Sequence, residues 1–284
     1  MKFQHYLITR FNITVKFECP RRDGDKPENP SLDPEYLKAR FDLFEAYTVP
    51  SVAHQTKKDF SWIVLFHRDT PDVFKKRIEA IKSGCENFIP LYLDDEQSLH
   101  FVSVMDDFIA QHCWGDHVLT SRLDNDDAIS TDYIEAVQSC VQNHGPGTYI
   151  ISMEYGLQYD VKMKLAYRYL YRANHFLSML TPLSAEKKTV YSFNHAFLDT
   201  YDIDVQYIQG THAYWAEIIH ASNYSNDLAL YPWSLILNYG TRQYYDFIDW
   251  TLGTFITHVL RSACCIGKAD IQKIARKVKR VSNT

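Results

Sequence analysis

The chain has 284 residues, a formal net charge of −5, 46% hydrophobic residues and only 10 glycines. This length allows a sizeable core in one large domain or two small ones, and the composition excludes a disordered or collagen-like chain. The negative charge gives no reason to expect a nucleic-acid partner, and no apolar run of about 18 residues predicts a membrane span.

Cysteine usage and the first residues both favour a cytoplasmic protein. The six cysteines include no CxxC pair and no zinc-like spacing with histidine, so we expect reduced thiols. No long apolar segment follows Met1–Tyr6, so no signal peptide is expected.

Strand-like and helix-like segments alternate through the first half of the chain. The predicted strands, which are short apolar runs, span residues 5–12, 60–66, 88–93, 118–123 and 148–153. The predicted helices span residues 37–49, 72–82, 99–112 and 132–142. Pro50 is expected to end or kink the first of these helices. The alternation predicts an α/β sheet with substantial parallel character.

The pattern divides the chain into three regions. Residues 1–155 hold the alternating strands and helices, and residues 156–245 are irregular and rich in aromatic side chains. Residues 246–284 hold an amphipathic helix, predicted at 246–260, and a basic end. We favour a helix packed on the rest of the chain with a solvated tail. The alternative is adhesion of the basic end to an anionic membrane.

Three carboxylates follow the predicted strand at 118–123 within four residues, at Asp124, Asp126 and Asp127. Carboxylates at this density repel one another and lose hydration unless a positive charge lies among them. Mg²⁺ and Mn²⁺ take oxygen ligands and are commonly shared with substrate phosphates. A strand that ends in such a cluster therefore predicts a metal-dependent site for a nucleoside diphosphate.

The acidic cluster also has two structural alternatives. An EF-hand loop beginning at Asp124 would need glycine at its sixth position, where the chain has Ile129, so we reject it. A solvated turn whose carboxylates cap the helix near Asp132 stays open, and Asp127 or Ser130 could do only that.

Segments that carry a more specific signal are, in chain order, Leu7–Asn12, Arg40–Phe44, Val49–Thr56, Phe60–Phe66 and Thr120–Asp127. Together they resemble a bacterial family of rhamnosyltransferases of the GT-A type, in which Leu123–Asp127 would hold the DxD motif. The likeness covers residues 5–145 well and extends more loosely to Asn223. It implies a GT-A-like (Rossmann-like) mixed sheet flanked by helices, an irregular aromatic-rich acceptor region and a C-terminal helix.

The resemblance implies a divalent metal, Mn²⁺ or Mg²⁺, at the acidic cluster. Asp126 would coordinate the ion, and Asp124 would contact the ribose or the metal shell. His220 is the expected distal histidine ligand, with His195 and His212 as rivals, although a lone histidine is more often a packed or surface residue.

The residues implied to bind the nucleotide are Thr9, Arg10, Arg68, Asp69, Arg122 and Asp124. They follow or end the first, second and fourth predicted strands. A surface salt bridge is an even alternative for Arg10 and for Arg68. We expect Arg122 to pair with Asp124 or Asp127 rather than to touch phosphate, because it lies beside them at a strand end.

Transfer with inversion needs a carboxylate as general base on the acceptor hydroxyl. Glu217 and Glu154 are the leading candidates, and either could instead be a solvated carboxylate. The remaining candidates are Asp199, Asp202 and Asp204. The aromatic residues that could stack on a sugar ring, or be buried in the core, are Tyr214, Trp215 and Trp233.

The sequence therefore predicts an enzyme that transfers a sugar, rhamnose by resemblance, from a dTDP- or UDP-linked donor to a glycan or lipid-linked glycan acceptor. Residues 1–155 would bind the nucleotide-sugar, and residues 156–245 would form the acceptor side of the same domain. The protein would be cytoplasmic or peripheral at the inner face of the membrane. One alternative is a metal-dependent nucleotidyltransferase or phosphohydrolase, although the chain lacks the Gly-rich phosphate loop that nucleotidyltransferases generally have. The other alternative is a non-catalytic carbohydrate-binding module.

Overall fold

The structure, a computed structural model, describes residues 1–14, 32–162, 164–220 and 243–248, together with residues 228, 256, 260, 263 and 264. The helix predicted at 246–260 and the basic end lie largely outside the described residues. Within them, no helix is both long enough and apolar enough to cross a bilayer. The four cysteines described, Cys85, Cys113, Cys140 and Cys264, are free thiols.

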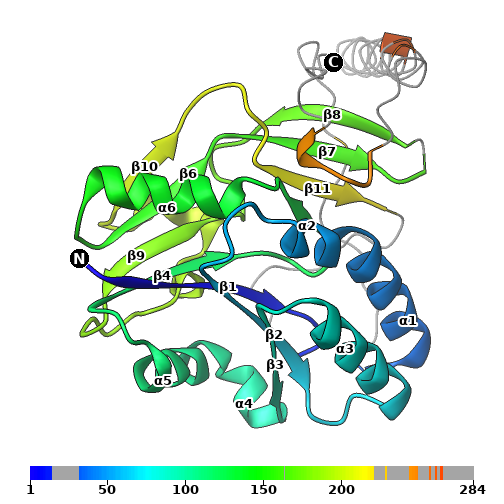
Figure 1. Cartoon of the computed structure of the whole chain (residues 1–284), viewed down its shortest axis with the longest axis horizontal. Helices are drawn as coiled ribbons and strands as arrows, with labels where there is room; N and C mark the ends of the chain where they lie inside the picture. Colours follow the sequence, from blue (N-terminus) through cyan, green and yellow to red (C-terminus); the bar gives the residue numbers. More distant parts are fainter. Residues whose placement is uncertain are drawn as a thin grey trace, which may run out of the picture.

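Seven strands form one large mixed sheet (Figure 1), in the order β10-β6-β9-β4-β1-β2-β3. They are β1 (Phe3–Arg10), β2 (Ser61–His67), β3 (Phe88–Leu93), β4 (His117–Arg122), β6 (Tyr149–Met153), β9 (Ser178–Pro182) and β10 (Asp204–Ile208). Every neighbouring pair is parallel except the two that β9 makes with β4 and β6. The carboxyl ends of the other six strands therefore lie along one edge. The predicted α/β class with a mixed sheet is confirmed.

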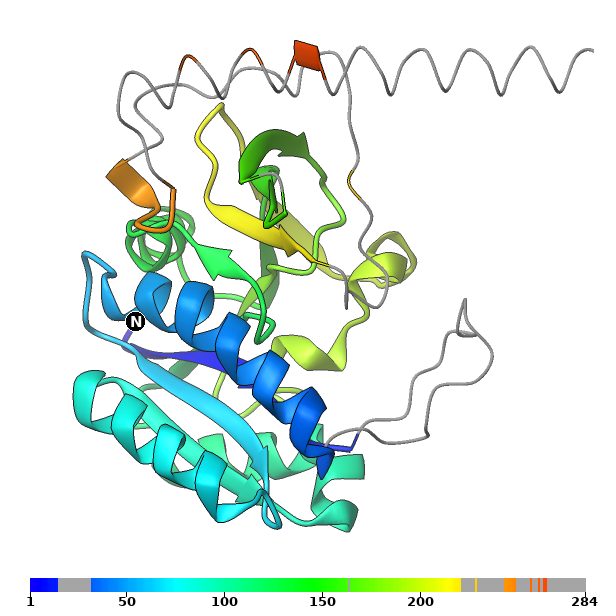
Figure 2. The same cartoon turned by 90° about the vertical axis from the view of Figure 1, so that its right-hand side faces the viewer.

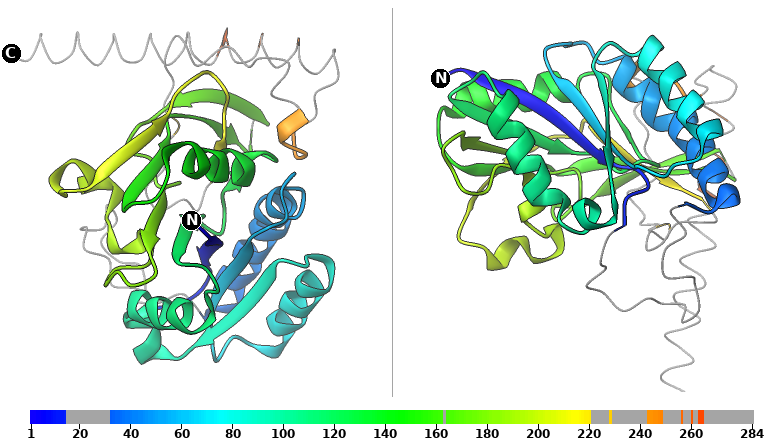
Figure 3. Two further views of the ribbon diagram at one scale, coloured as in Figure 1. Left: turned by 60° about the vertical axis from the view of Figure 1, so that its left-hand side comes forward. Right: turned by 90° about the horizontal axis from the view of Figure 1, so that it is seen from below.

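Helices cover both faces of this sheet (Figure 3). They are α1 (Pro34–Leu43), α2 (Val49–Ala53), α3 (Asp72–Gly84), α4 (Asp95–Leu99), α5 (Phe101–His112) and α6 (Tyr133–His144). Successive side chains of a strand point to opposite faces. Leu7 accordingly packs in a core with α1, α3 and α6, whereas Tyr6 and Ile8 pack in a second core with α5. Because both faces are buried, the strands read as continuous apolar runs.

A second, four-stranded sheet adjoins the carboxyl edge of the large one, in the order β5-β11-β7-β8. Its strands are β5 (Ala128–Ile129), β7 (Tyr155–Asp160), β8 (Leu165–Leu170) and β11 (Trp215–Ile219). The described residues of region 156–245 are thus more regular than expected, and they also supply β9 and β10 to the large sheet. Buried aromatic residues in this region obscure the alternation of apolar and polar positions along its strands. Gly156 packs directly against one of them, since a Cβ at this position would lie 2.1 Å from the ring of Trp215.

The helix containing Pro50 differs from the prediction. It begins at Pro34 rather than 37, and after a π-helical segment η2 (Phe44–Thr48) it continues as α2 to Ala53 (Figure 2). Pro50 therefore falls in the first turn of α2, directly after the π-helical segment, and does not end the helix. π-Helical turns are frequent at functional sites, and this one carries Thr48.

The buried side chain of His5 is expected to make the folded state less stable at acidic pH. The ring of His5, on β1, lies 2.8 Å through Nε2 from Ser121 Oγ and accepts from Gln138 at 3.3 Å. Burial lowers the pKa of His5 from 6.5 to about 3. Below pH 6.5 the unfolded chain therefore binds a proton at His5 that the folded chain does not, and stability falls as the pH falls.

We expect His5→Gln to flatten the decline in unfolding free energy between pH 7 and pH 5. The contribution of His5 is about 1.4 kcal/mol per pH unit well below its unfolded pKa. Urea denaturation at several pH values measures it. His112→Gln, at an exposed helix end, is the control and should keep the wild-type slope. Parallel curves for wild type and His5→Gln would contradict the assignment.

Candidate functional site

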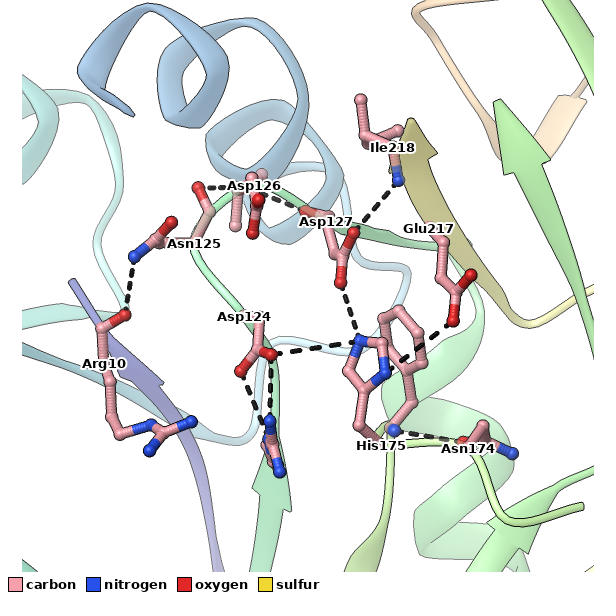
Figure 4. A network of polar contacts seen from close by, with 12 residues as sticks. Arg10, Asp124, Asn125, Asp126, Asp127, Asn174, His175, Glu217 and Ile218 are labelled. Atoms are coloured by element: carbon pink, nitrogen blue, oxygen red, sulfur yellow. Dashed lines mark hydrogen bonds and ion pairs between the residues drawn. The ribbon is translucent and has the colours of Figure 1, made fainter. Parts of the chain in front are cut away.

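The turn that follows β4 is fixed at its base by backbone and side-chain hydrogen bonds. The N–H of Asp127 donates to the carbonyl of Asp124 at 3.3 Å, which closes a β-turn. Asn125 Nδ2 donates to the carbonyl of Arg10 at 2.8 Å and so ties the turn to the end of β1 (Figure 4). Thr48 Oγ1 lies 3.1 and 2.7 Å from the carbonyl oxygens of Asn125 and Asp127. The three carboxylates therefore project from a rigid support.

Asp124 is held by Arg122, the last residue of β4. Arg122 Nε and Nη2 donate to the two carboxylate oxygens at 3.2 and 2.9 Å. Burial by itself would raise the pKa of Asp124, but Arg122 and then His175 outweigh it and hold that pKa well below its ordinary value. The expected pairing of Arg122 with a neighbouring carboxylate is confirmed.

Asp126 lies between an arginine and a histidine from distant parts of the chain. Arg40 Nη1, from α1, is 2.7 Å from Asp126 Oδ2, and His220 Nε2, just after β11, is 3.0 Å from the same oxygen. Burial opposes ionisation, yet Arg40 and the His220 bond lower the pKa of Asp126. The structure thus brings His220 to the acidic cluster, where the sequence reading placed it.

Asp127 begins a buried chain of polar groups that ends at Glu217 (Figure 4). One oxygen of Asp127 accepts from the N–H of Ile218 at 3.0 Å, and the other is 2.7 Å from His175 Nε2. His175 Nδ1 is 3.8 Å from Glu217 Oε1, and Gln158 donates to Glu217 Oε2 at 2.8 Å. Asp127 therefore braces the turn against β11 and does not cap the helix at Asp132.

His175 lies at the centre of this series of polar groups. Burial would lower the pKa of His175, but its bond to Asp127 and the charges of Asp127 and Asp124 raise it. Burial raises the pKa of Asp127 to about 7 against the pull of His175. The His175 ring thus lies between the side chains of Asp127 and Glu217.

The donor atoms around the turn fit a divalent cation. Single ligand atoms of Asp124, Asp127 and His175 lie within 4.8 Å of one another. Asp126 Oδ2 and His220 Nε2 are 3.0 Å apart. Adjacent ligands of an octahedral ion with bonds of about 2.1 Å are about 3.0 Å apart. Carboxylate oxygens are donors that suit Mg²⁺ and Mn²⁺, and His220 adds an imidazole nitrogen, which is a common donor to transition metals.

Three residues expected to bind nucleotide do not gather at the turn. Thr9 is fully buried, and its hydroxyl accepts from Trp62 Nε1 at 3.0 Å. Arg68, with 58% of its side chain exposed, lies 3.3 Å from Asp94, and Asp69 is exposed beside it. The ion pair with Asp94 is the surface salt bridge that the sequence left open for Arg68.

The two candidate bases lie in different surroundings. Glu217 is 4% exposed and belongs to the chain of polar groups at the turn, whereas Glu154 Oε1 lies 2.6 Å from Arg172 Nε. Glu154 follows β6, which is two strands, or about 10 Å, from β4. The other candidates, Asp199, Asp202 and Asp204, are exposed.

The alternative histidine ligands and the candidate stacking residues also lie in different surroundings. His212 lies 3.1 Å from Asp132, away from the turn, whereas the ring of His195 is 5.9 Å from that of His175. Trp215 is fully buried and belongs to the core, which leaves no face for a sugar. Tyr214 is partly buried, and Trp233 lies outside the described residues.

Sequence reasoning missed Arg40, His175 and Tyr191. Arg40 lies in one of the segments that carry the family resemblance, but no pattern around it links it to the acidic cluster. His175 follows Asn174 in the aromatic-rich region, without a motif. Tyr191 is one of 20 tyrosines, and its contact with Arg10 appears only in the folded chain.

Comparison with known proteins gives one family and several solved structures. The family described as “Putative rhamnosyl transferase” matches residues 4–229. A search of curated proteins finds no match to the chain. S. aureus TarS 1–349 with UDP-GlcNAc is similar at 9% identity and a TM-score of 0.43, over 78% of this chain and 60% of that one. Mouse xyloside xylosyltransferase 1 is similar at 13% identity and a TM-score of 0.31, over 54% and 53%.

Proposed function

This chain belongs to the rhamnosyl transferase family and is a glycosyltransferase, and from that premise we propose that it uses a divalent cation to transfer rhamnose from a nucleoside diphosphate donor. The observation that carries the proposal is the turn Asp124–Asp127 at the carboxyl edge of parallel strands. It presents carboxylates beside His220 and beside three arginines, Arg10, Arg40 and Arg122 (Figure 4). Family membership sets aside the nucleotidyltransferase, phosphohydrolase and binding-module alternatives.

Asp126 and His220 are the proposed metal ligands, with Asp124 beside them. Their donor set suits Mn²⁺ or Mg²⁺, and a bound ion would supply positive charge to the departing diphosphate. Arg40 stabilises Asp126 in its ionised form, so the ligand is ready without a change of protonation. Asp127, which is tied to His175 and Ile218, serves to hold the turn in place.

Glu217 is the proposed general base. It lies on β11 beside His175, whereas the carboxylate of Glu154 is already neutralised by Arg172. The amide of Gln158 fixes one oxygen of Glu217 and leaves the other to face His175. Removal of the acceptor proton by a carboxylate is the step that an inverting transfer requires of the protein.

The donor nucleotide is proposed to be dTDP or UDP, and the acceptor a glycan or a lipid-linked glycan. Support for a diphosphate comes from the arginines at the turn, because guanidinium groups match phosphate oxygens in charge and geometry. A lipid-linked acceptor would bring the protein to the inner face of the membrane, where the basic end could add attraction to anionic lipids.

A thermal-shift panel of nucleotide-sugars tests this function. The panel pairs dTDP-rhamnose, UDP-rhamnose, UDP-GlcNAc and GDP-mannose with Mn²⁺ or with EDTA. A ligand at a hundred times its Kd stabilises the native state by about 2.7 kcal/mol, so the true donor should raise the Tm by several degrees in Mn²⁺. No response to any nucleotide-sugar in Mn²⁺ would contradict the proposal, and a best response to UDP-GlcNAc would overturn rhamnose as the sugar.

A further inference from the structure

Arg10 differs in its contacts from the other two arginines at the turn, Arg40 and Arg122. Among the residues that the structure describes, Arg40 pairs with Asp126 and Arg122 pairs with Asp124, whereas Arg10 forms no ion pair. Its half-buried guanidinium projects toward the space beside Asp124 (Figure 4). A desolvated guanidinium without a carboxylate is a positive charge that an anionic ligand can satisfy.

Aromatic rings hold Arg10 in this position. Its Cζ lies 5.0 Å from the ring centroid of Tyr191 and 5.5 Å from that of Phe101, and the two rings meet edge to face at 5.3 Å. Tyr191 is itself fixed, because its hydroxyl donates to the carbonyl of Ile8 at 3.2 Å. Burial raises the pKa of Tyr191 to about 12, so the phenol stays neutral.

The same tyrosine ring also contacts Arg122. Arg122 Cζ lies 5.3 Å from the Tyr191 centroid, so the guanidinium groups of Arg10 and Arg122 contact the same ring. Asp124 forms its close ion pair with Arg122, at 2.9 Å, and among the described residues it forms none with Arg10. Because Arg10 covers Tyr191 and Phe101, these rings serve as a support for cations and not as a platform for a nucleobase.

We propose that Arg10, held on Tyr191 beside Arg122, binds the diphosphate of the donor without help from the metal, and that Tyr191 is the positioning residue for both arginines. This inference rests on the proposed function and assigns Arg10 to the phosphates rather than to the nucleoside. Two guanidinium groups on one ring suit a ligand with two adjacent phosphoryl groups.

The experiment measures binding of UDP, dTDP and UMP by calorimetry in EDTA and again in Mn²⁺. Wild-type protein should bind UDP or dTDP in EDTA more tightly than UMP. Arg10→Met should weaken diphosphate binding in EDTA about 10- to 100-fold, as expected for a lost charge-assisted hydrogen bond, and should abolish the preference over UMP. Arg10→Lys keeps the positive charge but not the planar guanidinium, and it should lose less affinity for the diphosphate than Arg10→Met does.

Two further comparisons separate positioning from general damage. Arg77 also lies against a ring, with its Cζ 5.0 Å from the centroid of Phe41, but it pairs with Asp42 and Glu45 away from the turn. Arg77→Met is therefore the matched control and should bind UDP as wild type does. Tyr191→Phe keeps the ring and should retain binding, whereas Tyr191→Leu should lose it as Arg10→Met does.

Each result distinguishes the inference from the function on which it rests. Wild-type binding in Mn²⁺ with none in EDTA, or equal binding by Arg10→Met, Arg10→Lys and Arg77→Met, would overturn the inference and leave the proposed function standing. Failure of the wild-type protein to bind any nucleoside diphosphate in Mn²⁺ would overturn both. Wild-type UDP binding by Tyr191→Leu would overturn the positioning role of the ring.

Discussion

Replacing Asp126 by asparagine is expected to lower Mn²⁺-dependent donor turnover about 10²- to 10³-fold, which corresponds to several kcal/mol of lost charge stabilisation. The amide keeps the size of the side chain but removes the negative charge that would bind the cation. The same substitution should abolish the rise in Tm that Mn²⁺ gives to the wild-type protein. Hydrolysis of the nucleotide-sugar without acceptor is a sufficient assay for turnover.

Asp132 offers a matched control for this substitution. Its Oδ1 is 3.1 Å from His212 Nε2, much as Asp126 Oδ2 is 3.0 Å from His220 Nε2, yet Asp132 lies away from the turn. Asp132→Asn should therefore keep both turnover and the Mn²⁺ response. Asp126→Asn also leaves Arg40 without its partner, so the shift caused by Mn²⁺, and not the absolute Tm, is the measure. Equal Mn²⁺ responses in the two variants would contradict a metal at Asp126.

Glu217→Gln is expected to lower the rate of sugar transfer about 10²- to 10⁴-fold, the usual contribution of a general base. Donor binding should be unchanged, because the base acts on the acceptor hydroxyl. The effect should therefore appear in kcat and not in the KM for the donor. Steady-state kinetics with the donor identified by the thermal-shift panel, combined with the Tm response to that donor, measures both.

Glu154→Gln distinguishes the two carboxylates that the sequence left open. Glu154 is paired with Arg172, so its replacement should change transfer less than about tenfold while costing some stability. A larger loss in Glu154→Gln than in Glu217→Gln would move the base to Glu154. Glu217→Gln with a wild-type kcat would remove Glu217 from the mechanism, and a loss of donor binding would show that it acts on the turn through His175.

Much of the fold in the first half could be predicted because its signals are local. The strand predicted at 88–93 is β3, and the one predicted at 60–66 is β2, displaced by one residue. An apolar run buried on both faces needs only its own side chains to be recognised. The continuation of the helix through Pro50 was harder to predict, since it follows a π-helical segment that no local pattern marks and whose last residue, Thr48, contacts the distant turn at Asn125 and Asp127.

The candidate site was predictable only where its residues are neighbours in sequence. Asp124, Asp126 and Arg122 stand together at the end of one strand, so charge repulsion and strand direction were enough to predict a site there. The resemblance added His220, which the structure places against Asp126. Arg68 and Asp69 follow the end of β2, yet their side chains turn to solvent, because a strand end fixes the position of a residue and not its direction.

The sequence by itself determined where the acidic turn lies, which strands lead to it and to which family the chain belongs. Only the tertiary structure decided which charges neutralise that turn. Arg40 and Asp126 are 86 residues apart, and His175 and Asp127 are 48 apart. Burial makes an uncompensated carboxylate costly, so each is matched by whichever cation the packing of the sheets and helices brings within reach. That packing is set by the whole core, and no local pattern encodes it.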